Sequence, residues 1–504
     1  MYPFSFYKNL VKWENKAYNL KENFEGRFTM KNIQVKDIVR ECNGSLVFGD
    51  ENIECINFST DTRKIENGDV YVGLKGEKFD GSKFFKDALE KGAKVCILQN
   101  IEINDEIKNE YKDRAIIIVE NTLKALQNIA KYKRSLYNIP VIAITGSVGK
   151  TSTKDMVASI VSTKYKTLKT EGNFNNHIGV PLTILRLKDE EAMVVEMGMS
   201  NLGEISLLTK IAKPTIAVIT NVGTAHIGNL GSRENILKAK LEILEGLSKD
   251  GTVVINNDND LLHKWYLENK DNYNIVTYGI ENDSMEKAQD INYLESSSKY
   301  NLKNEGIIEV PVGGEAFVYN SLAAISVGKT LGISMDKIKQ GILKFELTKM
   351  RLDVQKSSKG YTIINDCYNA NYDSMKSALQ YLNRTPGNRK IAMLGDMLEL
   401  GDFSKKLHEG VGNAVVENKV DILITVGKEA KNIAKIAIEN NVETYEYTDN
   451  NSAISKLKDN NYIIASCNQG LFTYGGHFIV LIGIEGDYIK VYDPYLYNGK
   501  FDVA

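Results

Sequence analysis

The segment that most constrains the fold of this chain is residues 142–152, which read Ile-Ala-Ile-Thr-Gly-Ser-Val-Gly-Lys-Thr-Ser. An apolar run at 141–144 predicts a buried strand, and a helix-compatible stretch begins at Thr153. Glycines in the loop between them let backbone N–H groups approach phosphates, toward which the helix directs its positive end. Lys150 is placed to reach the outer phosphates and Thr151 to bind Mg²⁺. The sequence therefore predicts a nucleotide-binding loop.

The loop departs from the usual G-x-x-x-x-G-K-[ST] motif, because Ile144 stands where the first glycine would be. A glycine turn before a lysine also arises by chance, so the loop alone leaves an ordinary structural turn as an alternative. Other apolar runs of the same block end in polar residues, namely Glu196, Asn221 and Asn256. Because ligands bind at the carboxyl ends of parallel strands, these positions favour the nucleotide site.

Length and composition indicate a large globular protein. At 504 residues the chain exceeds a single core, and roughly three domains are expected. The net charge of −2 does not indicate a basic surface that would bind nucleic acid or an anionic membrane. No apolar run approaches the ~20 residues of a membrane helix. Five widely spaced cysteines without a C-x-x-C read as reduced thiols of a cytoplasmic protein. We therefore expect neither nucleic-acid binding nor stable membrane insertion.

Three α/β blocks and a tail are predicted along the chain. Continuous apolar runs between helical stretches indicate parallel strands covered on both faces. The aromatic-rich N-terminal extension is interrupted by lysines, so it is read as a docking or disordered segment rather than a signal peptide, with a membrane-surface helix as the alternative. The predicted boundaries are 1–29 for the extension, 30–137, 138–345 and 346–458 for the blocks, and 459–504 for the tail.

A possible metal site accompanies the loop in the middle block. Glu196 ends one predicted strand, and His226 follows Asn221 at the end of the next. A carboxylate and an imidazole beside a phosphate loop suit Mg²⁺, which is usually held by few protein ligands and by substrate phosphates. Each residue taken singly has an ordinary alternative: a cap or surface charge for Glu196, a structural role for His226 and a solvated helix position for Lys240.

Six ordered motifs complete this pattern, at 145–152, 171–182, 195–200, 220–226, 365–371 and 394–402. Taken together, residues 30–458 resemble the ATP-dependent Mur ligase family of cell-wall synthesis. That resemblance implies a three-domain α/β architecture: a UDP-sugar-binding domain, a central P-loop parallel-sheet ATPase domain and a Rossmann-like C-terminal domain, here followed by a short β-hairpin tail. The stretch at 172–176 is similar to the members that add D-alanyl-D-alanine rather than single amino acids.

The resemblance implies roles for individual residues. Lys150, Lys240 and His226 are expected to be catalytic, with Lys240 carbamylated so that it becomes an anion beside the cation. The expected metal ligands are Thr151, Glu196, His226 and Lys240. The expected nucleotide contacts are Gly146, Ser147, Val148, Gly149, Lys150, Thr151, Ser152, Asn320, Arg351 and Asp366. The expected substrate contacts are Thr60, Asp61, Thr62, Arg63, Lys75, Gly76, Asn173, Asn175 and Asn176.

The implied reaction uses ATP and Mg²⁺ as cofactors. ATP phosphorylates the carboxylate of a UDP-N-acetylmuramoyl tripeptide, the amine of D-alanyl-D-alanine attacks the acyl phosphate, and phosphate leaves; the protein is expected to act as a monomer. A folylpolyglutamate-synthase-like ligase is the main rival, because it shares the phosphate loop and metal residues. The Asp-Thr-Arg at 61–63 and the stretch at 172–176 argue against it.

The chain departs from the family pattern at three places. Tyr372 replaces a proline of the third block, and Ser82 stands where histidine is common. After 451–458 the family would continue with a strand and a Lys-Gly-Ser-Arg loop, which this chain lacks. An inactive, nucleotide-binding relic is therefore a further alternative, although the apolar run at 462–466 is suited to cover the exposed sheet edge.

The tail resembles the His/Asp half of papain-like peptidases of the bacteriocin-processing type. If a three-residue turn places Ile484 opposite Tyr488, then His477 and Asp493 lie roughly 7 Å apart on one sheet face. Such a site also needs a cysteine at an upstream helix start, and Cys467 lies in an apparent strand close before His477. The tail is therefore predicted to be an orphaned half-domain without proteolytic activity.

Overall fold

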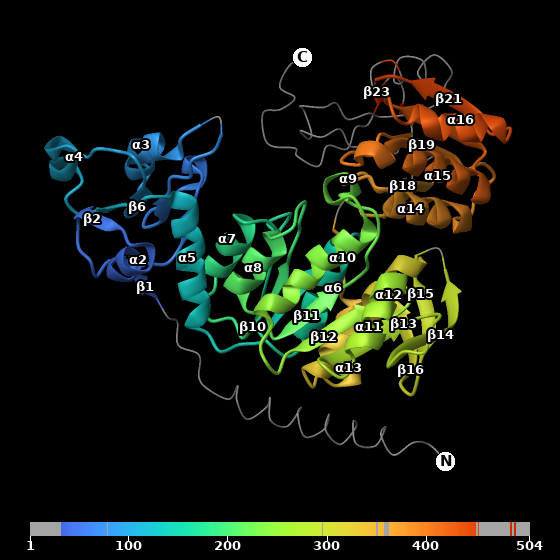
Figure 1. Ribbon diagram of the computed structural model, residues 1–504, viewed down its shortest axis with the longest axis horizontal. Helices are drawn as coiled ribbons and strands as arrows, with labels where there is room; N and C mark the ends of the chain where they lie inside the picture. Colours follow the sequence, from blue (N-terminus) through green and yellow to red (C-terminus); the bar gives the residue numbers. More distant parts are fainter. Residues whose placement is uncertain are drawn as a thin grey trace.

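The central α/β domain lies between two others, with the N-terminal α/β domain on its left and the C-terminal α/β domain above its right side (Figure 1). The predicted three-domain α/β architecture is confirmed, and we use the predicted ranges 30–137, 138–345 and 346–458 for the domains. The structure is a computed structural model that describes residues 32–77, 79–294, 296–348, 351–356, 362–449 and 452 and two strands at 484–485 and 488–489.

The N-terminal domain is built on a five-stranded sheet. Its strand order is β2-β7-β6-β5-β4, in which only the pair β2 and β7 is antiparallel. The central strand β6 is buried along its whole length, as its continuous apolar sequence predicts. The strands are β2 (Ser45–Phe48), β4 (Phe58–Ser59), β5 (Val70–Val72), β6 (Val95–Leu98) and β7 (Ala115–Ile118), with β1 (Ile33–Gln34) and β3 (Glu54–Cys55) paired separately. The helices are α2 (Val35–Cys42), α3 (Phe85–Glu90), α4 (Asp105–Glu110) and α5 (Thr122–Ser135).

The central domain has a nine-stranded sheet in the order β16-β15-β14-β13-β12-β11-β8-β10-β9. Strands β8 to β14 are parallel, as predicted, whereas β15 and β16 extend the sheet in antiparallel fashion. The sequence did not predict this extension, because β15 alternates buried and half-buried residues instead of forming an apolar run. The strands are β8 (Val141–Thr145), β9 (Thr167–Lys169), β10 (Ala192–Glu196), β11 (Ile216–Ile219), β12 (Thr252–Asn256), β13 (Asn274–Gly279), β14 (Glu286–Tyr293), β15 (Ser298–Leu302) and β16 (Gly306–Val310).

Helices cover both faces of this sheet. Along β8, Val141 and Ala143 join the core beneath α7 and α8, while Ile142 and Ile144 pack on the side of α6 and α12. In the described part of the chain, no helix has both the length and the apolar character needed to cross a membrane. The helices are α6 (Lys150–Val161), α7 (Gly179–Leu185), α8 (Glu204–Ala212), α9 (Ile227–Leu230), α10 (Arg233–Leu241), α11 (Asp260–Asn269), α12 (Glu315–Thr330) and α13 (Met335–Leu343).

A buried arginine joins the N-terminal domain to the central one. Helix α5 packs against α7 and α8, and its Arg134 is only 7% exposed. The guanidinium donates hydrogen bonds to the carbonyls of Ala212 at 2.8 Å, Lys213 at 3.2 Å and Tyr137 at 2.6 Å. Two of these carbonyls close the C-terminal end of α8, where helix carbonyls lack partners. Arg134 therefore fixes the two domains to each other.

The C-terminal domain contains a parallel sheet, β19-β20-β21, and an antiparallel pair, β17 and β18. The strands predicted at 361–364, 390–394 and 421–426 correspond to β18, β19 and β20 within one residue. The strands are β17 (Asp353–Lys356), β18 (Thr362–Asn365), β19 (Ile391–Gly395), β20 (Ile422–Val426) and β21 (Glu443–Tyr447). The helices are α14 (Tyr372–Arg384), α15 (Ser404–Glu417) and α16 (Lys431–Glu439), and the short 3₁₀ helix η4 spans Gly401–Phe403.

The predicted register of the tail hairpin is wrong by one residue. Strand β22 (Ile484–Glu485) pairs with β23 (Tyr488–Ile489) so that Ile484 faces Ile489 rather than Tyr488. This leaves two residues between the strands, the loop length that hairpins favour. A one-residue shift moves side chains to the other face of a strand. The observed register therefore does not support the prediction that His477 and Asp493 are neighbours on one sheet face. Both lie outside the described residues, as do Cys467, the run at 462–466 and the N-terminal extension.

Candidate active site

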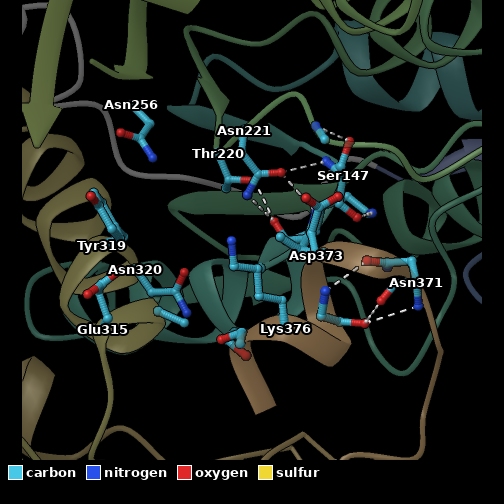
Figure 2. A pocket seen from close by; sticks show the side chains of 18 of the residues that line it. Ser147, Thr220, Asn221, Asn256, Glu315, Tyr319, Asn320, Asn371, Asp373 and Lys376 are labelled. Carbon is cyan, nitrogen blue, oxygen red and sulfur yellow. Dashed lines mark hydrogen bonds between the residues drawn. The ribbon is translucent and has the colours of Figure 1, made fainter. Parts of the chain in front are cut away.

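The predicted phosphate loop connects β8 to the N-terminus of α6. Its last residue, Gly149, caps the helix with a φ of 81° and no side-chain cap. The N–H groups of the first turn of α6 therefore have neither an intrahelical acceptor nor a capping side chain, which suits them to bind an anion. The loop borders a cavity of about 550 Å³ that is also lined by α12 and, from the C-terminal domain, α14 (Figure 2). Its size suits a nucleotide-sized ligand.

Asn221, which follows β11, shapes the loop (Figure 2). Its side-chain oxygen accepts hydrogen bonds from the N–H groups of Ser147 and Val148, at 3.1 and 3.0 Å, and its amide nitrogen donates to the Val148 carbonyl. Two of the N–H groups that the sequence assigned to phosphate are thus already paired within the protein. The donors left for an anion are those at the start of α6.

Lys150 lies back along the loop. Its ammonium donates to the Gly146 carbonyl at 2.8 Å and to the Ser147 carbonyl at 3.4 Å. Burial lowers the pKa of Lys150; nearby Glu196 opposes that shift and Arg351 adds to it. A phosphate group in the cavity would offer the ammonium a stronger, charged acceptor than two carbonyls.

All but one of the predicted nucleotide contacts line this cavity. The exception is Gly146, which has a φ of 155° and packs so closely on Thr220, the residue after β11, that an added Cβ would lie 1.8 Å from the Thr220 hydroxyl. Gly146 therefore shapes the loop on the side that packs against Thr220 and not on the side of the cavity. The predicted residues that line the cavity are Ser147, Val148, Gly149, Lys150, Thr151, Ser152, Asn320, Arg351 and Asp366.

Arg351 and Asp366 bring the C-terminal domain to the phosphate loop. The Arg351 guanidinium stacks over the Tyr368 ring at 4.0 Å and donates to the Thr151 hydroxyl at 3.4 Å. The Asp366 carboxylate accepts a hydrogen bond from the Leu352 N–H at 3.1 Å. Burial raises the pKa of Asp366 to about 6, although that hydrogen bond and the charge of Arg351 act in the opposite direction.

Glu196 and Lys240 provide the features expected of a cation site. One oxygen of the Glu196 carboxylate accepts from the Asn175 amide at 2.8 Å, and the other is buried without a hydrogen-bond partner. Lys240 is 1% exposed and makes no ion pair within the described ranges; burial, and then the charge of Lys150, lower its pKa well below the usual value. A buried carboxylate oxygen without a donor and a buried lysine whose pKa is lowered fit a cation beside a modified amine.

The described residues contain no cluster of three or more His, Cys, Asp or Glu side chains arranged to hold a metal ion. The predicted ligand set has only two such side chains, Glu196 and His226, so it would also rely on the Thr151 hydroxyl, a modified Lys240 and phosphate oxygens, which agrees with the preference of Mg²⁺ for few protein ligands. His226, at the start of α9, contacts the Glu399 carboxylate through Nδ1. That hydrogen bond lowers the pKa of Glu399.

The predicted UDP-sugar residues lie in the N-terminal domain, apart from the nucleotide cavity. Asp61 caps a 3₁₀ turn and forms two hydrogen bonds with the Arg63 guanidinium, at 2.9 and 2.8 Å. The Arg63 side chain is 84% exposed, so it is accessible to a ligand. Lys75 and Gly76 belong to a tight turn in which the Gly76 N–H donates to the Phe79 carbonyl.

The three asparagines predicted to contact substrate differ in their surroundings. Asn175 donates to Glu196, as described above. Asn176 accepts hydrogen bonds from the N–H groups of Ile178 and Gly179, at 3.1 and 2.8 Å, and so stabilises the start of α7. Asn173 is exposed. The structure thus gives Asn175 and Asn176 contacts within the protein and leaves Asn173 free to meet a ligand.

Sequence reasoning missed three residues of the C-terminal domain. Asp373 accepts hydrogen bonds from the central domain, Glu399 contacts His226, and Lys376 extends from α14 into the cavity (Figure 2). Asp373 and Lys376 stand three residues apart on α14, directly after the motif at 365–371, so helical spacing was the available signal. The sequence does not reveal that this face of α14 meets the central domain.

Comparison with known proteins shows to which family the chain belongs. Three family models match it: "Mur ligase family, catalytic domain" at residues 56–134, "Mur ligase middle domain" at 144–328 and "Mur ligase, glutamate ligase domain" at 350–464. The UDP-N-acetylmuramoyl-tripeptide–D-alanyl-D-alanine ligase of Bacillus subtilis is 39% identical over 80% of this chain and 87% of that protein. The chain belongs to the Mur ligase family. The enzyme of the same name from Escherichia coli is 33% identical to this Mur ligase, over 80% of this chain and 86% of its own length.

Solved Mur ligase structures share the fold. MurF from Acinetobacter baumannii has a TM-score of 0.77 and 30% identity, covering 86% of this chain and 93% of that one. MurF from Thermotoga maritima in complex with ADP has a TM-score of 0.67 and 29% identity, covering 80% and 96%. A folylpolyglutamate synthase from Mycobacterium tuberculosis has a TM-score of 0.52 over 67% of this chain, but at 17% identity this likeness shows the fold alone.

Two departures of this Mur ligase from the expected family sequence are accommodated locally. Tyr372 takes the first position of α14, where proline also fits, and its ring packs against Gly410 of α15. The fully buried Ser82 accepts a hydrogen bond from the Gln99 N–H and donates to the Gly73 carbonyl. Ser82 therefore satisfies nearby backbone groups, and Tyr372 fits at the start of α14 by packing against α15.

Proposed function

We propose that this Mur ligase is an ATP-dependent enzyme that adds D-alanyl-D-alanine to UDP-N-acetylmuramoyl tripeptide in peptidoglycan precursor synthesis. The observation that carries the proposal is the cavity at the phosphate loop, which the central and C-terminal domains build together. Relatives with this activity in their names are 33% and 39% identical and align over more than four-fifths of their own length. One of the solved neighbours of the same fold binds ADP, in agreement with a nucleotide in this cavity.

The proposed chemistry overcomes the low reactivity of a carboxylate. An oxygen of the tripeptide carboxylate attacks the γ-phosphorus of ATP, the bond to ADP breaks, and an acyl phosphate forms. The amine of D-alanyl-D-alanine then attacks the acyl carbon, loses a proton and displaces phosphate. Because both steps are transfers between bound reactants, the protein acts mainly by positioning them and stabilising phosphoryl charge.

Lys150 and the start of α6 supply that charge stabilisation. We assign the phosphates to the first-turn N–H groups of α6 and to the Lys150 ammonium, which exchanges the carbonyls of Gly146 and Ser147 for phosphate oxygens. Arg351 and Asp366 contact the nucleotide from the C-terminal domain, and Asn320 contacts its base. The position of all these residues around one cavity supports the assignment.

We further propose that Thr151, Glu196, His226 and a carbamylated Lys240 hold Mg²⁺. The buried, unpartnered oxygen of Glu196 supports this set. Carbamylation requires a neutral amine, which attacks CO₂ and releases a proton; the lowered pKa of Lys240 favours that form. A bound divalent cation would offset negative charge on the transferring phosphoryl group.

Residues of the N-terminal domain and of the 172–176 stretch are proposed to bind the substrates. Thr60, Asp61, Thr62, Arg63, Lys75 and Gly76 are assigned to the UDP-sugar, and Asn173, Asn175 and Asn176 to the peptide portions. The free thiols of Cys42, Cys55 and Cys96 support a location in the reducing cytoplasm, where ATP is supplied. We expect the enzyme to act as a monomer.

The decisive experiment measures phosphate release from ATP by the full chain. Release should require both UDP-N-acetylmuramoyl tripeptide and D-alanyl-D-alanine. Release driven by a folate and glutamate would instead identify the folylpolyglutamate-synthase-like alternative. An inactive relic would bind ATP and release no phosphate with either pair, whereas a chimera carrying a family-type C-terminus would be active.

A further inference from the structure

The contact between His226 and Glu399 crosses a domain boundary. His226 directly precedes α9 in the central domain, Glu399 lies between β19 and η4 in the C-terminal domain, and α9 packs against η4. Figure 1 shows α9 next to the C-terminal domain. The His226 ring contacts the Glu399 carboxylate through Nδ1, and among the described residues no other acidic side chain forms an ion pair with His226. The carboxylate that orients this imidazole therefore comes from a different domain.

Backbone contacts fix the two residues in this arrangement. The Gly228 N–H donates to the Glu399 carbonyl at 3.0 Å. A Cβ added to Gly228 would lie 2.6 Å from that carbonyl oxygen and 2.6 Å from the Gly401 nitrogen, so the segments meet without room for a side chain. His226 and Glu399 both have positive φ values, 64° and 60°, although neither is glycine. Such left-handed residues cost free energy and persist where the surroundings enforce them, often at functional sites.

The chemistry of this pair suits the orientation of a metal ligand. A histidine that binds a metal through one ring nitrogen commonly gives its other N–H to a carboxylate, which fixes the tautomer and the ring orientation. Here Glu399 occupies Nδ1 of His226. The remaining nitrogen, Nε2, is then the one available to a cation.

We propose that Glu399 is a positioning residue that orients His226 toward a divalent cation, so that docking of the C-terminal domain completes the cation site of the central domain. This inference rests on the proposed role of His226 as a metal ligand and adds the residue that controls it. The inference predicts that the affinity for the cation depends on Glu399, although this side chain does not touch the cation. It also predicts that this affinity rises when the C-terminal domain docks on the central domain.

The test is a titration of the full chain with Mn²⁺ in the presence of a non-hydrolysable ATP analogue, followed by electron paramagnetic resonance. Glu399→Gln should weaken Mn²⁺ binding about 10-fold or more, the loss typical of removing such a partner. Glu399→Asp, which keeps the carboxylate, should restore part of the affinity. Small-angle scattering should show that Glu399→Gln remains as compact as the wild type, and its melting temperature should show that it is folded.

Two further variants separate the possible outcomes. His226→Ala tests the metal role itself: wild-type Mn²⁺ affinity in this variant would overturn the proposed ligand set. If His226→Ala loses affinity and Glu399→Gln does not, only the positioning role of Glu399 is overturned. Gly228→Ala forces the two segments apart and should both expand the molecule and weaken Mn²⁺ binding. If Glu399→Gln expands the molecule as much as Gly228→Ala does, its effect arises from lost docking, and the positioning role is again overturned.

Discussion

The Asp373 carboxylate of the C-terminal domain accepts two hydrogen bonds from Thr224 of the central domain, from its N–H at 2.8 Å and its hydroxyl at 3.1 Å. The neighbouring Gly223 donates its N–H to the Ser147 hydroxyl in the phosphate loop. A Cβ at Gly223 would lie 2.2 Å from the same Asp373 carboxylate. The segment after β11 therefore connects the phosphate loop directly to the C-terminal domain.

Asp373→Asn should raise the KM for ATP several-fold. The substitution keeps the shape of the side chain but replaces a charged acceptor with a neutral one, and charge-assisted hydrogen bonds are about twice as strong as neutral ones. The measurement is steady-state kinetics with ATP as the varied substrate. Asp402→Asn, at an exposed position of η4, is the matched control and should behave like the wild type. An unchanged KM in Asp373→Asn would show that this contact does not influence nucleotide binding.

Lys376→Met should weaken ATP binding about 10-fold, corresponding to about 1.4 kcal/mol, and leave adenosine binding unchanged. Lys376 extends into the nucleotide cavity and has no ion pair among the described residues, so its charge is available to phosphates. Calorimetric titrations with ATP and adenosine measure the difference. Lys406→Met, an exposed lysine of α15, controls for the loss of a positive charge. Equal losses for both ligands would indicate a packing role for Lys376.

Lys240→Ala should abolish ligation while leaving the protein folded. The lysine is buried without an ion pair in the described region, and its carbamate is proposed to hold the cation. Short carboxylic acids added to the assay should restore part of the activity, because their carboxylates fit the space of the carbamate. Circular dichroism checks folding. Full activity of the alanine variant would remove Lys240 from the active site.

Asp366→Asn should stabilise the nucleotide-free protein at neutral pH and not at low pH. The folded-state pKa of about 6 exceeds the ordinary value of 3.8. The contribution of the Asp366 carboxyl to the stability of the folded protein is therefore fully present below pH 3.8 and is lost as the pH rises through 6. Asparagine does not ionise and carries no such penalty, so the free energy of unfolding of Asp366→Asn at pH 8 should exceed that of the wild type by on the order of 1–3 kcal/mol. Thermal unfolding of both proteins between pH 4 and pH 8 measures the difference. A gain that is independent of pH would contradict the raised pKa.

Arg134→Met should destabilise the protein by about 2–4 kcal/mol, because three backbone carbonyls lose a charged donor in a buried site. Denaturant unfolding, followed by a probe in each of the first two domains, should show that their transitions separate. Lys131→Met, at an exposed position of the same helix, should have little effect. Coincident transitions in Arg134→Met would show that other contacts suffice to join the domains.

Local signals in the sequence were sufficient to predict much of the fold. The apolar run before Gly146 predicted β8, and the polar residues at the carboxyl ends of β10, β11 and β12 marked the edge of the sheet that faces the site. Contacts between distant residues were not predictable in the same way. His226 and Glu399 are 173 residues apart, and nothing near either one indicates its partner. The prediction of the hairpin register was wrong for a related reason. Two turn lengths fit the same residues, and only one of them matches the observed pairing.

The close approach of Gly228 to Gly401 has a consequence for inhibition. A carbon added at Gly228 would lie 2.6 Å from backbone atoms of the facing segment, and one added at Gly401 would lie 3.2 Å from the Gly228 Cα, so the closed arrangement leaves little room at this point. A small molecule that lodges between α9 and η4 would act as a wedge and hold the two domains apart. Such a compound needs no resemblance to ATP or to a peptide, and its selectivity would depend on the shape of a seam that lies outside the nucleotide cavity.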